Sequence, residues 1–156
     1  MDSFFDSNVL DSSSVEEKIR KLTEKIIRNP EDYFSCKEQA KLLLNNNPNK
    51  LKAGIALEAL EKVLENEPED IEANCLAIRA LRLKGNYDDA LSRAERLKSK
   101  FQNTAIIYEE LGRIQLKLEN YDEALKILEL GHEKFRGNER IMRALVLALM
   151  EFKKYH

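Results

Sequence analysis

Residues 86–91 read Asn-Tyr-Asp-Asp-Ala-Leu, and residues 120–125 repeat them as Asn-Tyr-Asp-Glu-Ala-Leu, 34 residues further along the chain. The same period links the Ala-Leu pair at residues 56–57 to the pair in the first hexapeptide, and it links Tyr121 to Tyr155. Three coincidences at one spacing are not expected by chance. A period of this length is typical of a helix–turn–helix unit that stacks on copies of itself.

The copy at residues 105–138 shows how each unit would bury its apolar side. Apolar and small residues recur in it at spacings of three and four, which is the period of one helix face. Small residues in these stripes let paired helices approach closely. Tyr121, directly after the turn, is placed to fill the gap between successive hairpins, while Asn120 and Asp122 supply turn and N-cap chemistry. The two stripes are Tyr108, Leu111, Gly112 and Gln115, then Ala124, Leu128 and Gly131.

This pattern resembles the tetratricopeptide repeat family, whose signature has Leu-Gly in the first helix, Tyr after the turn, Ala early in the second helix and Pro near the end. The resemblance implies an all-α fold, a right-handed solenoid of antiparallel helix pairs, with a role in binding proteins. The second repeat departs from the signature, with Ala77-Ile78 in place of Leu-Gly and Gln102 in place of Pro. The matching residues are Leu111, Gly112, Tyr121 and Ala124, one copy earlier Gly85, Tyr87 and Ala90, and Pro68 before those.

The chain is expected to divide into a tail and a repeat domain. Residues 1–13 are acidic and Ser-rich and are predicted to be a tail, either a free terminus or docked through its apolar residues. Ser14-Val-Glu-Glu resembles a capping box that starts a lead-in helix at the N-terminal end of the stack. The longest turn is expected at Asn45–Lys50. The repeat domain, 14–156, is predicted to hold a lead-in helix at 14–28, repeats at about 31–70, 71–104 and 105–138, and a partial repeat at 139–156. The predicted helices are 14–28, 31–45, 52–66, 71–84, 88–101, 105–118, 122–135 and 139–155.

The last predicted helix has apolar residues on more than one face, whereas a terminal capping helix should have a polar outer face. Tyr155 stands where the next second helix would begin. We therefore expect either that the natural protein continues beyond this helix or that another chain, including a second copy, covers it. The alternative is an apolar final helix with no such role. The apolar residues are Ile141, Met142, Leu145, Val146, Leu149 and Phe152.

The resemblance implies that first helices line an inner, concave wall, with repeat positions two, five, nine and twelve exposed on it. Position nine then reads Lys41, Arg79 and Arg113, a ladder of cations. Arginine forks bind carboxylates well, so the wall is predicted to hold a protein or peptide segment that carries acidic groups. The alternative is a solvated or locally paired surface, in which Glu72 and Glu109 neutralise their neighbours. The predicted groove residues are Lys41, Arg79, Arg82, Arg113, Arg140 and Arg143.

The full stripes also test a known activity of the family, the binding of chaperone C-terminal tails. That clamp needs Lys and Asn in one repeat, Asn in the next, and Lys and Arg in the third. Neither register supplies the set, since the five positions read Lys37, Lys41, Leu76, Ile106 and Glu110, or Cys75, Arg79, Glu110, Arg140 and Ala144. Chaperone-tail binding is therefore disfavoured. The stripes run through Phe34, Lys37, Lys41 and Leu44 if the first helix begins at Tyr33, then Glu72, Cys75, Arg79 and Arg82, then Ile106, Glu109, Arg113 and Leu116, then Arg140, Arg143, Leu147 and Met150.

Catalysis and metal binding have little support in the sequence. The chain has two histidines, His132 and His156, and no phosphate-binding loop, HExxH or nucleophile-elbow motif. Cys36 and Cys75 lie far apart and have no CxxC partner. We therefore predict a protein that is not an enzyme and has no cofactor or metal.

Nucleic-acid and membrane binding are also disfavoured. The formal net charge is −2, and the predicted groove lacks the aromatic residues that stack on bases. No apolar run is long enough to span a bilayer, and the N-terminus is acidic where a secretory signal is basic. The leading hypothesis is a cytoplasmic interaction scaffold. Its rival is a substrate-recruiting or regulatory module of a longer enzyme.

Overall fold

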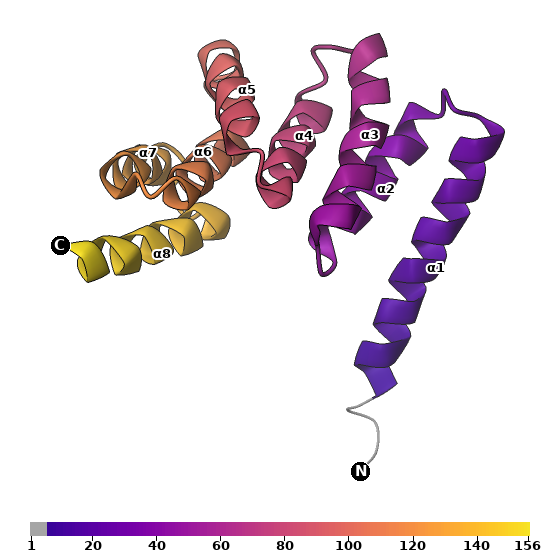
Figure 1. The fold of residues 1–156 in the computed structure, drawn as a ribbon, viewed down its shortest axis with the longest axis horizontal. Helices are drawn as coiled ribbons and strands as arrows, with labels where there is room; N and C mark the ends of the chain where they lie inside the picture. The colour runs from indigo at the N-terminus through magenta and orange to yellow at the C-terminus, as the bar shows by residue number, and fades with distance from the viewer. Residues whose placement is uncertain (1–5) are drawn as a thin grey trace. The chain divides into compact units, whose positions relative to one another are not determined.

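The computed structural model describes the backbone of residues 6–156 and the side chains from Ser14 onward. Within this range every regular element is an α-helix, and successive helices are joined by short turns (Figure 1). The predicted all-α fold of helix pairs is confirmed. The described residues form α1 (Asp6–Arg28), α2 (Tyr33–Asn45), α3 (Lys50–Asn66), α4 (Ile71–Lys84), α5 (Tyr87–Lys100), α6 (Ala105–Lys117), α7 (Tyr121–Lys134) and α8 (Glu139–Tyr155).

Helices α2 to α8 begin and end within two residues of their predicted bounds. The prediction for α1 is wrong at its start, because the helix begins at Asp6 and passes through Ser14 without a break. No Gly or Pro lies within α1, and Ser, Asp and Asn cost only a few tenths of a kcal/mol each, about 0.5, inside a helix. Residues 1–5 and the side chains of 6–13 lie outside the described part, which leaves docking of the tail a prediction.

The chain forms two compact units. Unit 1 ends at Lys84 and contains α1 to α4, whereas unit 2 begins at Gly85 and contains α5 to α8. Inside unit 1 each helix packs on the next, and α2 also packs on α4. Inside unit 2 each helix again packs on the next, and α6 also packs on α8. Each unit therefore places two first helices side by side, which is the arrangement that a repeat wall requires.

Small side chains bring the helices of unit 1 together. Ala40 of α2, Ala53 and Ala56 of α3, and Ala77 and Ala80 of α4 are all fully buried in one cluster. An alanine at a helix contact lets the two backbones approach more closely than a branched residue would. Larger side chains from the same helices complete the apolar core, including Leu43, Leu44, Leu60, Val63, Leu64 and Leu76.

In unit 2, glycines allow the paired helices to approach closely. A Cβ atom at Gly112 of α6 would lie 2.3 Å from Cγ of Leu128, and one at Gly131 of α7 would lie 2.9 Å from Cβ of Tyr108. Both distances are below any normal carbon–carbon contact. The predicted stripes of α6 and α7 therefore face each other as expected, and the two glycines are the points of closest approach.

The repeated hexapeptide forms the same local structure in both copies. Asn86 and Asn120 precede α5 and α7 with nearly equal angles, φ −84° and ψ 66° against φ −86° and ψ 68°. The residue before each has a positive φ, 89° at Gly85 and 62° at Glu119. The predicted side-chain cap is wrong, because neither asparagine caps its helix. The amide of Asn120 donates instead to Oε1 of Gln115, at 2.9 Å.

The tyrosine after the turn packs against its equivalent in the next repeat. The rings of Tyr121 and Tyr155 stack, with centroids 5.0 Å apart and planes 9° from parallel. The contact joins the start of α7 to the end of α8. The prediction that Tyr121 fills the gap between successive helix pairs is confirmed for unit 2.

Candidate functional site: the first-helix walls

The first helices meet along the predicted stripes in both units. Helix α2 begins at Tyr33, the register assumed for the stripe. In unit 1, position five contacts position two of the next first helix through Lys37 and Glu72, with Nζ 3.6 Å from Oε2. In unit 2 the equivalent pair is Glu109 and Arg140, with Oε2 3.2 Å from Nε. The same geometric contact thus recurs with the charges exchanged.

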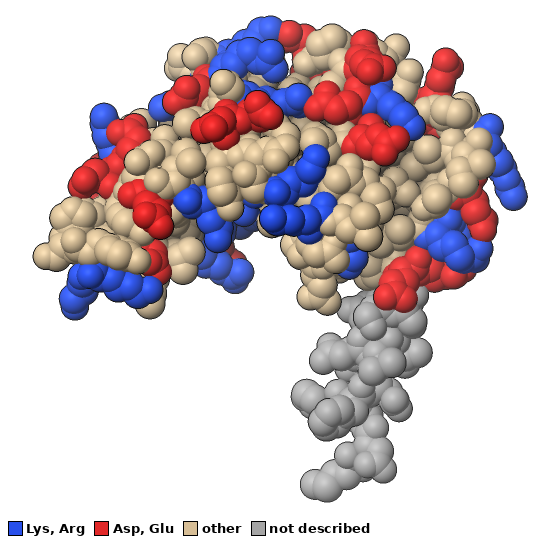
Figure 2. Space-filling model, in the orientation of Figure 1, with Lys and Arg blue, Asp and Glu red and all other residues tan. Residues whose placement is uncertain are grey.

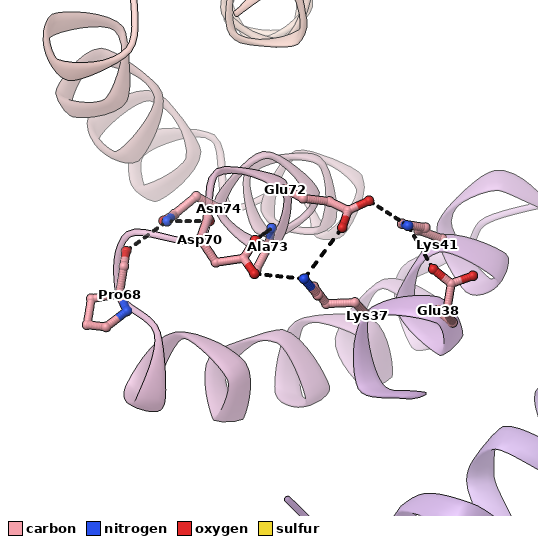
Figure 3. Close-up of polar contacts among 8 residues, drawn as sticks. All are labelled: Lys37, Glu38, Lys41, Pro68, Asp70, Glu72, Ala73 and Asn74. Carbon is pink, nitrogen blue, oxygen red and sulfur yellow. Dashed lines mark hydrogen bonds and ion pairs between the residues drawn. The ribbon is translucent and has the colours of Figure 1, made fainter. Parts of the chain in front are cut away.

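The wall of unit 1 is a closed network of ion pairs between α2 and α4 (Figure 3). Nζ of Lys37 lies 2.8 Å from Oδ2 of Asp70. Nζ of Lys41 lies 2.5 Å from Oε1 of Glu72 and 2.7 Å from Oε1 of Glu38. Both lysines are therefore satisfied by acids of the same wall. For Lys41, the structure agrees with the alternative of a locally paired surface, and not with an exposed cation that is available to a ligand.

Asp70 has a second role, because it precedes the first residue of α4. Its Oδ1 accepts a hydrogen bond of 2.8 Å from the backbone amide of Ala73. Burial alone would raise the pKa of Asp70, but the Ala73 amide and the Lys37 ammonium together lower it below its ordinary value of 3.8. Conversely, the hydrogen bond that Lys37 donates to Asp70 raises the pKa of Lys37 above 10.5. Both groups are held charged by the fold.

The Asp70–Lys37 pair is expected to stabilise unit 1 over a defined pH range. Asp70→Asn keeps a capping oxygen but removes the charge, and we expect it to lower the free energy of unfolding at pH 7 by about 1–2 kcal/mol. Because the folded pKa of Asp70 is depressed, the difference from wild type should vanish as pH falls below 3.8. Since the folded pKa of Lys37 is raised, it should also vanish as pH rises above 10.5.

Urea unfolding monitored by circular dichroism at a series of pH values measures this difference. Asp122→Asn is the control, since Asp122 is an exposed acid in the first turn of α7. It should change stability by less than about 0.5 kcal/mol at any pH. A pH-independent effect of Asp70→Asn would contradict the pairing.

Arg79 does not lie on an exposed surface, and this part of the prediction is wrong. Its side chain is buried, at 5% exposed, and Cys75 one turn earlier is buried too. Nη1 of Arg79 donates to Oδ1 of Asn45 at 2.9 Å, next to the C-terminal end of α2. A cation at that end is favoured by the helix dipole. Arg79 therefore joins α4 to α2, while Arg82 lies half-buried at the end of α4.

The wall of unit 2 is organised around one buried carboxylate. Glu109 is 2% exposed, and its Oε1 lies 3.0 Å from Nε of Arg113. Its other oxygen contacts Arg140 of α8, so two cations share one acid. Arg143 lies one turn further along α8 and contacts only the exposed Glu139 among the ion pairs of the described residues, at 3.7 Å. The structure thus brings Arg113, Arg140 and Arg143 together on neighbouring helices.

Sequence reasoning missed several partners that decide the electrostatics of these walls. Asp70, Glu38 and Asn45 lie off the predicted stripes, yet each binds a cation of those stripes. Glu38 could have been found, because it is three residues before Lys41 on the same helix. Figure 2 shows the general result, with acidic and basic side chains interspersed over the face in view.

Other kinds of site are sparse in the described residues. No group of three or more His, Cys, Asp or Glu is arranged there to hold a metal ion. Across residues 6–156, no helix has the length and apolar character of a membrane span.

Helix pairs with a period of 34 residues, close-packed glycines and neighbouring first helices define a helical-repeat protein of the tetratricopeptide type. Residues 49–130, just over half of the chain, match the model of the family described as anaphase-promoting complex, cyclosome, subunit 3. The chain belongs to this family. No curated protein matches the sequence significantly.

Solved structures agree with the fold. A crystal structure of MamA protein superposes with a TM-score of 0.71 at 16% identity, over 94% of this chain and 78% of that one. A second MamA structure gives 0.68 at 14% identity, over 99% and 98%. A tetratricopeptide repeat protein from Parabacteroides merdae gives 0.50 at 17%, over 92% and 68%. Identities this low show likeness of fold alone. Family and fold together support a general role as a protein–protein interaction scaffold.

Proposed function

We propose that this protein is a non-enzymatic scaffold that binds an acidic, partly apolar segment of another protein on the wall formed by α6 and α8. The observation that carries the proposal is the exposure of Arg143, at 78%, beside Arg140, at 52%. An arginine with this exposure keeps donor groups for an incoming carboxylate, and its fork geometry suits bidentate contacts.

The pairing and exposure of the cations favour the wall of unit 2 over that of unit 1. The unit 2 wall has three cations against two acids, namely Arg113, Arg140 and Arg143 against Glu109 and Glu139. The network of unit 1 has two cations against three acids, namely Lys37 and Lys41 against Glu38, Asp70 and Glu72. The unit 1 wall also holds Arg79 and Arg82, but Arg79 is buried and Arg82 is half-buried, so the more exposed arginines that an acidic segment can reach lie on the unit 2 wall.

Exposed apolar side chains give the same wall a second means of recognition. Ile106 of α6 and Leu147 and Met150 of α8 belong to the inner stripes and are each more than a third exposed. Burying such side chains favours binding by roughly 25 cal/mol per Å². The ligand is therefore an amphipathic segment, with apolar side chains on these residues and carboxylates near the arginines.

The family name describes a subunit of a multi-protein complex. As part of the proposal, we infer that this protein also acts as a subunit of a multi-protein complex. Its partner there supplies the acidic segment.

Arg143→Glu is expected to weaken the binding of acidic segments at least tenfold, about 1.4 kcal/mol. The probes are fluorescein-labelled peptides with identical apolar residues and with either Glu or Gln at the remaining positions, and fluorescence anisotropy gives the affinity. Wild type should prefer the Glu series. Lys126→Glu is the matched control, because Lys126 is also 78% exposed and also pairs weakly with an acid of its own helix.

Lys126→Glu should leave the affinity within about twofold of wild type. Equal losses in the two variants would mean that only net charge matters. No preference for the Glu series would contradict the acidic ligand. Circular dichroism of both variants should show the wild-type helix content.

A further inference from the structure

The outer face of α8 carries apolar side chains that the described chain leaves uncovered. Met142, Val146 and Leu149 follow one another at spacings of four and three, so they form one stripe. Each is about half exposed, with Val146 at 56%. Met150 lies beside Val146 and is exposed to a similar extent. Apolar side chains that are contiguous and exposed in this way mark a contact surface.

The repeat period identifies what kind of element fits this stripe. One period earlier, the equivalent residues of α6 are Tyr108, Gly112 and Gln115, and all three are buried. Helix α7 covers them, with Leu128 against Gly112 and Gly131 against Tyr108. The exposed stripe of α8 is thus the surface that a second helix covers in the neighbouring pair. Its natural ligand is another helix, lying antiparallel to α8.

That helix differs in shape from α7. Leu128 packs directly over the bare backbone of Gly112, whereas α8 presents the branched side chain of Val146 at the same position. A helix with leucine there cannot approach α8 as closely as α7 approaches α6. The surface of α8 therefore suits a partner helix that packs with a larger distance between the two helix axes. Side chains of intermediate size would then meet over Val146.

Within its described side chains, α1 does not offer such a helix. The exposed side chains of residues 14–28 in α1 are charged apart from Ser14 and Ile27. Arg20, for example, pairs with Glu17 and Glu24 across this surface. Head-to-tail stacking of α1 on α8 would bury these charges against an apolar stripe, which is costly. A self-complementary association of identical chains through α8 avoids this cost.

Helix α8 is self-complementary in charge when two copies lie antiparallel. Glu139, Met142, Val146, Met150 and Lys153 lie along one face of the helix, at spacings of three and four. A two-fold axis through Val146 places Met142 against Met150 of the second copy. It also places Glu139 at one end against Lys153 of the second copy. The two ends of the contact thus carry opposite charges and the centre is apolar.

We propose that two copies of this chain associate through α8, antiparallel and with the two-fold axis at Val146. The contact is one helix pair, which is smaller than the roughly 800 Å² per partner of a standard stable interface. The dimer is therefore weak and reversible, with a dissociation constant in the micromolar range. It leaves Ile106 and Arg113 of α6 open, but it covers Met150 and engages Glu139, the ion-pair partner of Arg143, so the dimer and the acidic segment proposed above share part of α8.

The first experiment measures the oligomeric state by sedimentation velocity from about 1 µM to about 1 mM, which brackets contacts of this size. Wild type should shift from monomer to dimer. Val146→Glu should raise the dissociation constant by about a hundredfold, because two carboxylates would meet at the apolar centre of the contact. Leu130→Glu is the matched control on α7, with a similarly exposed apolar residue, and should leave the dimer unchanged.

The second experiment tests the orientation by exchanging charges. Glu139→Lys and Lys153→Glu should each weaken the dimer several-fold, and the double variant should restore it, because each end of the contact again pairs opposite charges. Val146→Cys should form a disulfide-linked dimer on mild oxidation. The native Cys36 and Cys75 do not compete, since both are buried.

Three results would overturn the proposal. A wild-type protein that stays monomeric at the highest concentration excludes the dimer. A dimer that Val146→Glu does not affect lies elsewhere on the chain. Failure of the charge exchange to restore the dimer excludes the antiparallel pairing.

Discussion

Replacing Gly112 by alanine is expected to lower the free energy of unfolding by about 2–3 kcal/mol, because the site has no room for a methyl group. The new Cβ would lie 2.3 Å from Cγ and within 2.7 Å of both terminal methyls of Leu128, a fully buried side chain. Since all three atoms belong to one buried side chain, either Leu128 must take another rotamer or α6 and α7 must move apart, and both changes disturb the other contacts of the pair. Urea unfolding followed by circular dichroism measures the loss.

Two controls separate this clash from the ordinary effect of a Gly-to-Ala change. Gly54 lies inside α3 with nothing within 4 Å of a built Cβ. Gly54→Ala should therefore stabilise the protein by about 0.5–1 kcal/mol, through helix propensity alone. Leu128→Ala should cost about 2–5 kcal/mol in the wild-type background but much less in combination with Gly112→Ala. Additive losses would contradict a direct clash.

Arg79→Glu is expected to lower the free energy of unfolding by about 3–5 kcal/mol, the usual effect of leaving an uncompensated charge in a buried place. The new carboxylate would lie beside Oδ1 of Asn45, an acceptor that now receives the Arg79 guanidinium. It would also lie near the C-terminal end of α2, where a negative charge is unfavourable. Thermal and urea unfolding both report this change.

Arg143→Glu provides the comparison, because Arg143 belongs to the same set of predicted groove residues but is exposed. Its reversal should change stability by less than about 0.5 kcal/mol. Arg79→Lys, which keeps the charge but loses the fork, should cost less than Arg79→Glu. If Arg79→Glu folded as stably as Arg143→Glu, the buried position of Arg79 would be wrong. Charge reversal at Arg79 is for the same reason a poor probe of ligand binding, and Arg143 is the better one.

The sequence predicted the helices well, because its signals are local. Turn residues such as Asn86 and Asn120 recur at a fixed spacing, and the stripes of α6 and α7 repeat with the helix period. The start of α1 failed for the same reason. Ser14 and Glu17 form a capping pattern, which is compatible with a helix start but does not require one. Because no Gly or Pro precedes them within α1, the helix begins earlier than this pattern indicated.

The candidate site was predicted less completely, because ion pairs depend on distances between helices. Position nine was assigned three cations from the sequence. The structure pairs Lys41 within its own wall, buries Arg79 against the end of α2, and gives Arg113 a carboxylate that it shares with Arg140. Whether a cation on a stripe is exposed or paired follows from side chains some 30 residues away in the chain.

By itself, the sequence determined the repeat, the order and extent of seven helices, and the register of the stripes that face one another. The period, the turn residues and the small residues are properties of short segments, and they are sufficient to fix how neighbouring helices pair. Only the tertiary structure decided which charges neutralise one another and which apolar face stays uncovered. Glu109 shows why, since its two arginines are four residues away on α6 and on the next first helix, α8, and only packing brings both to one carboxylate.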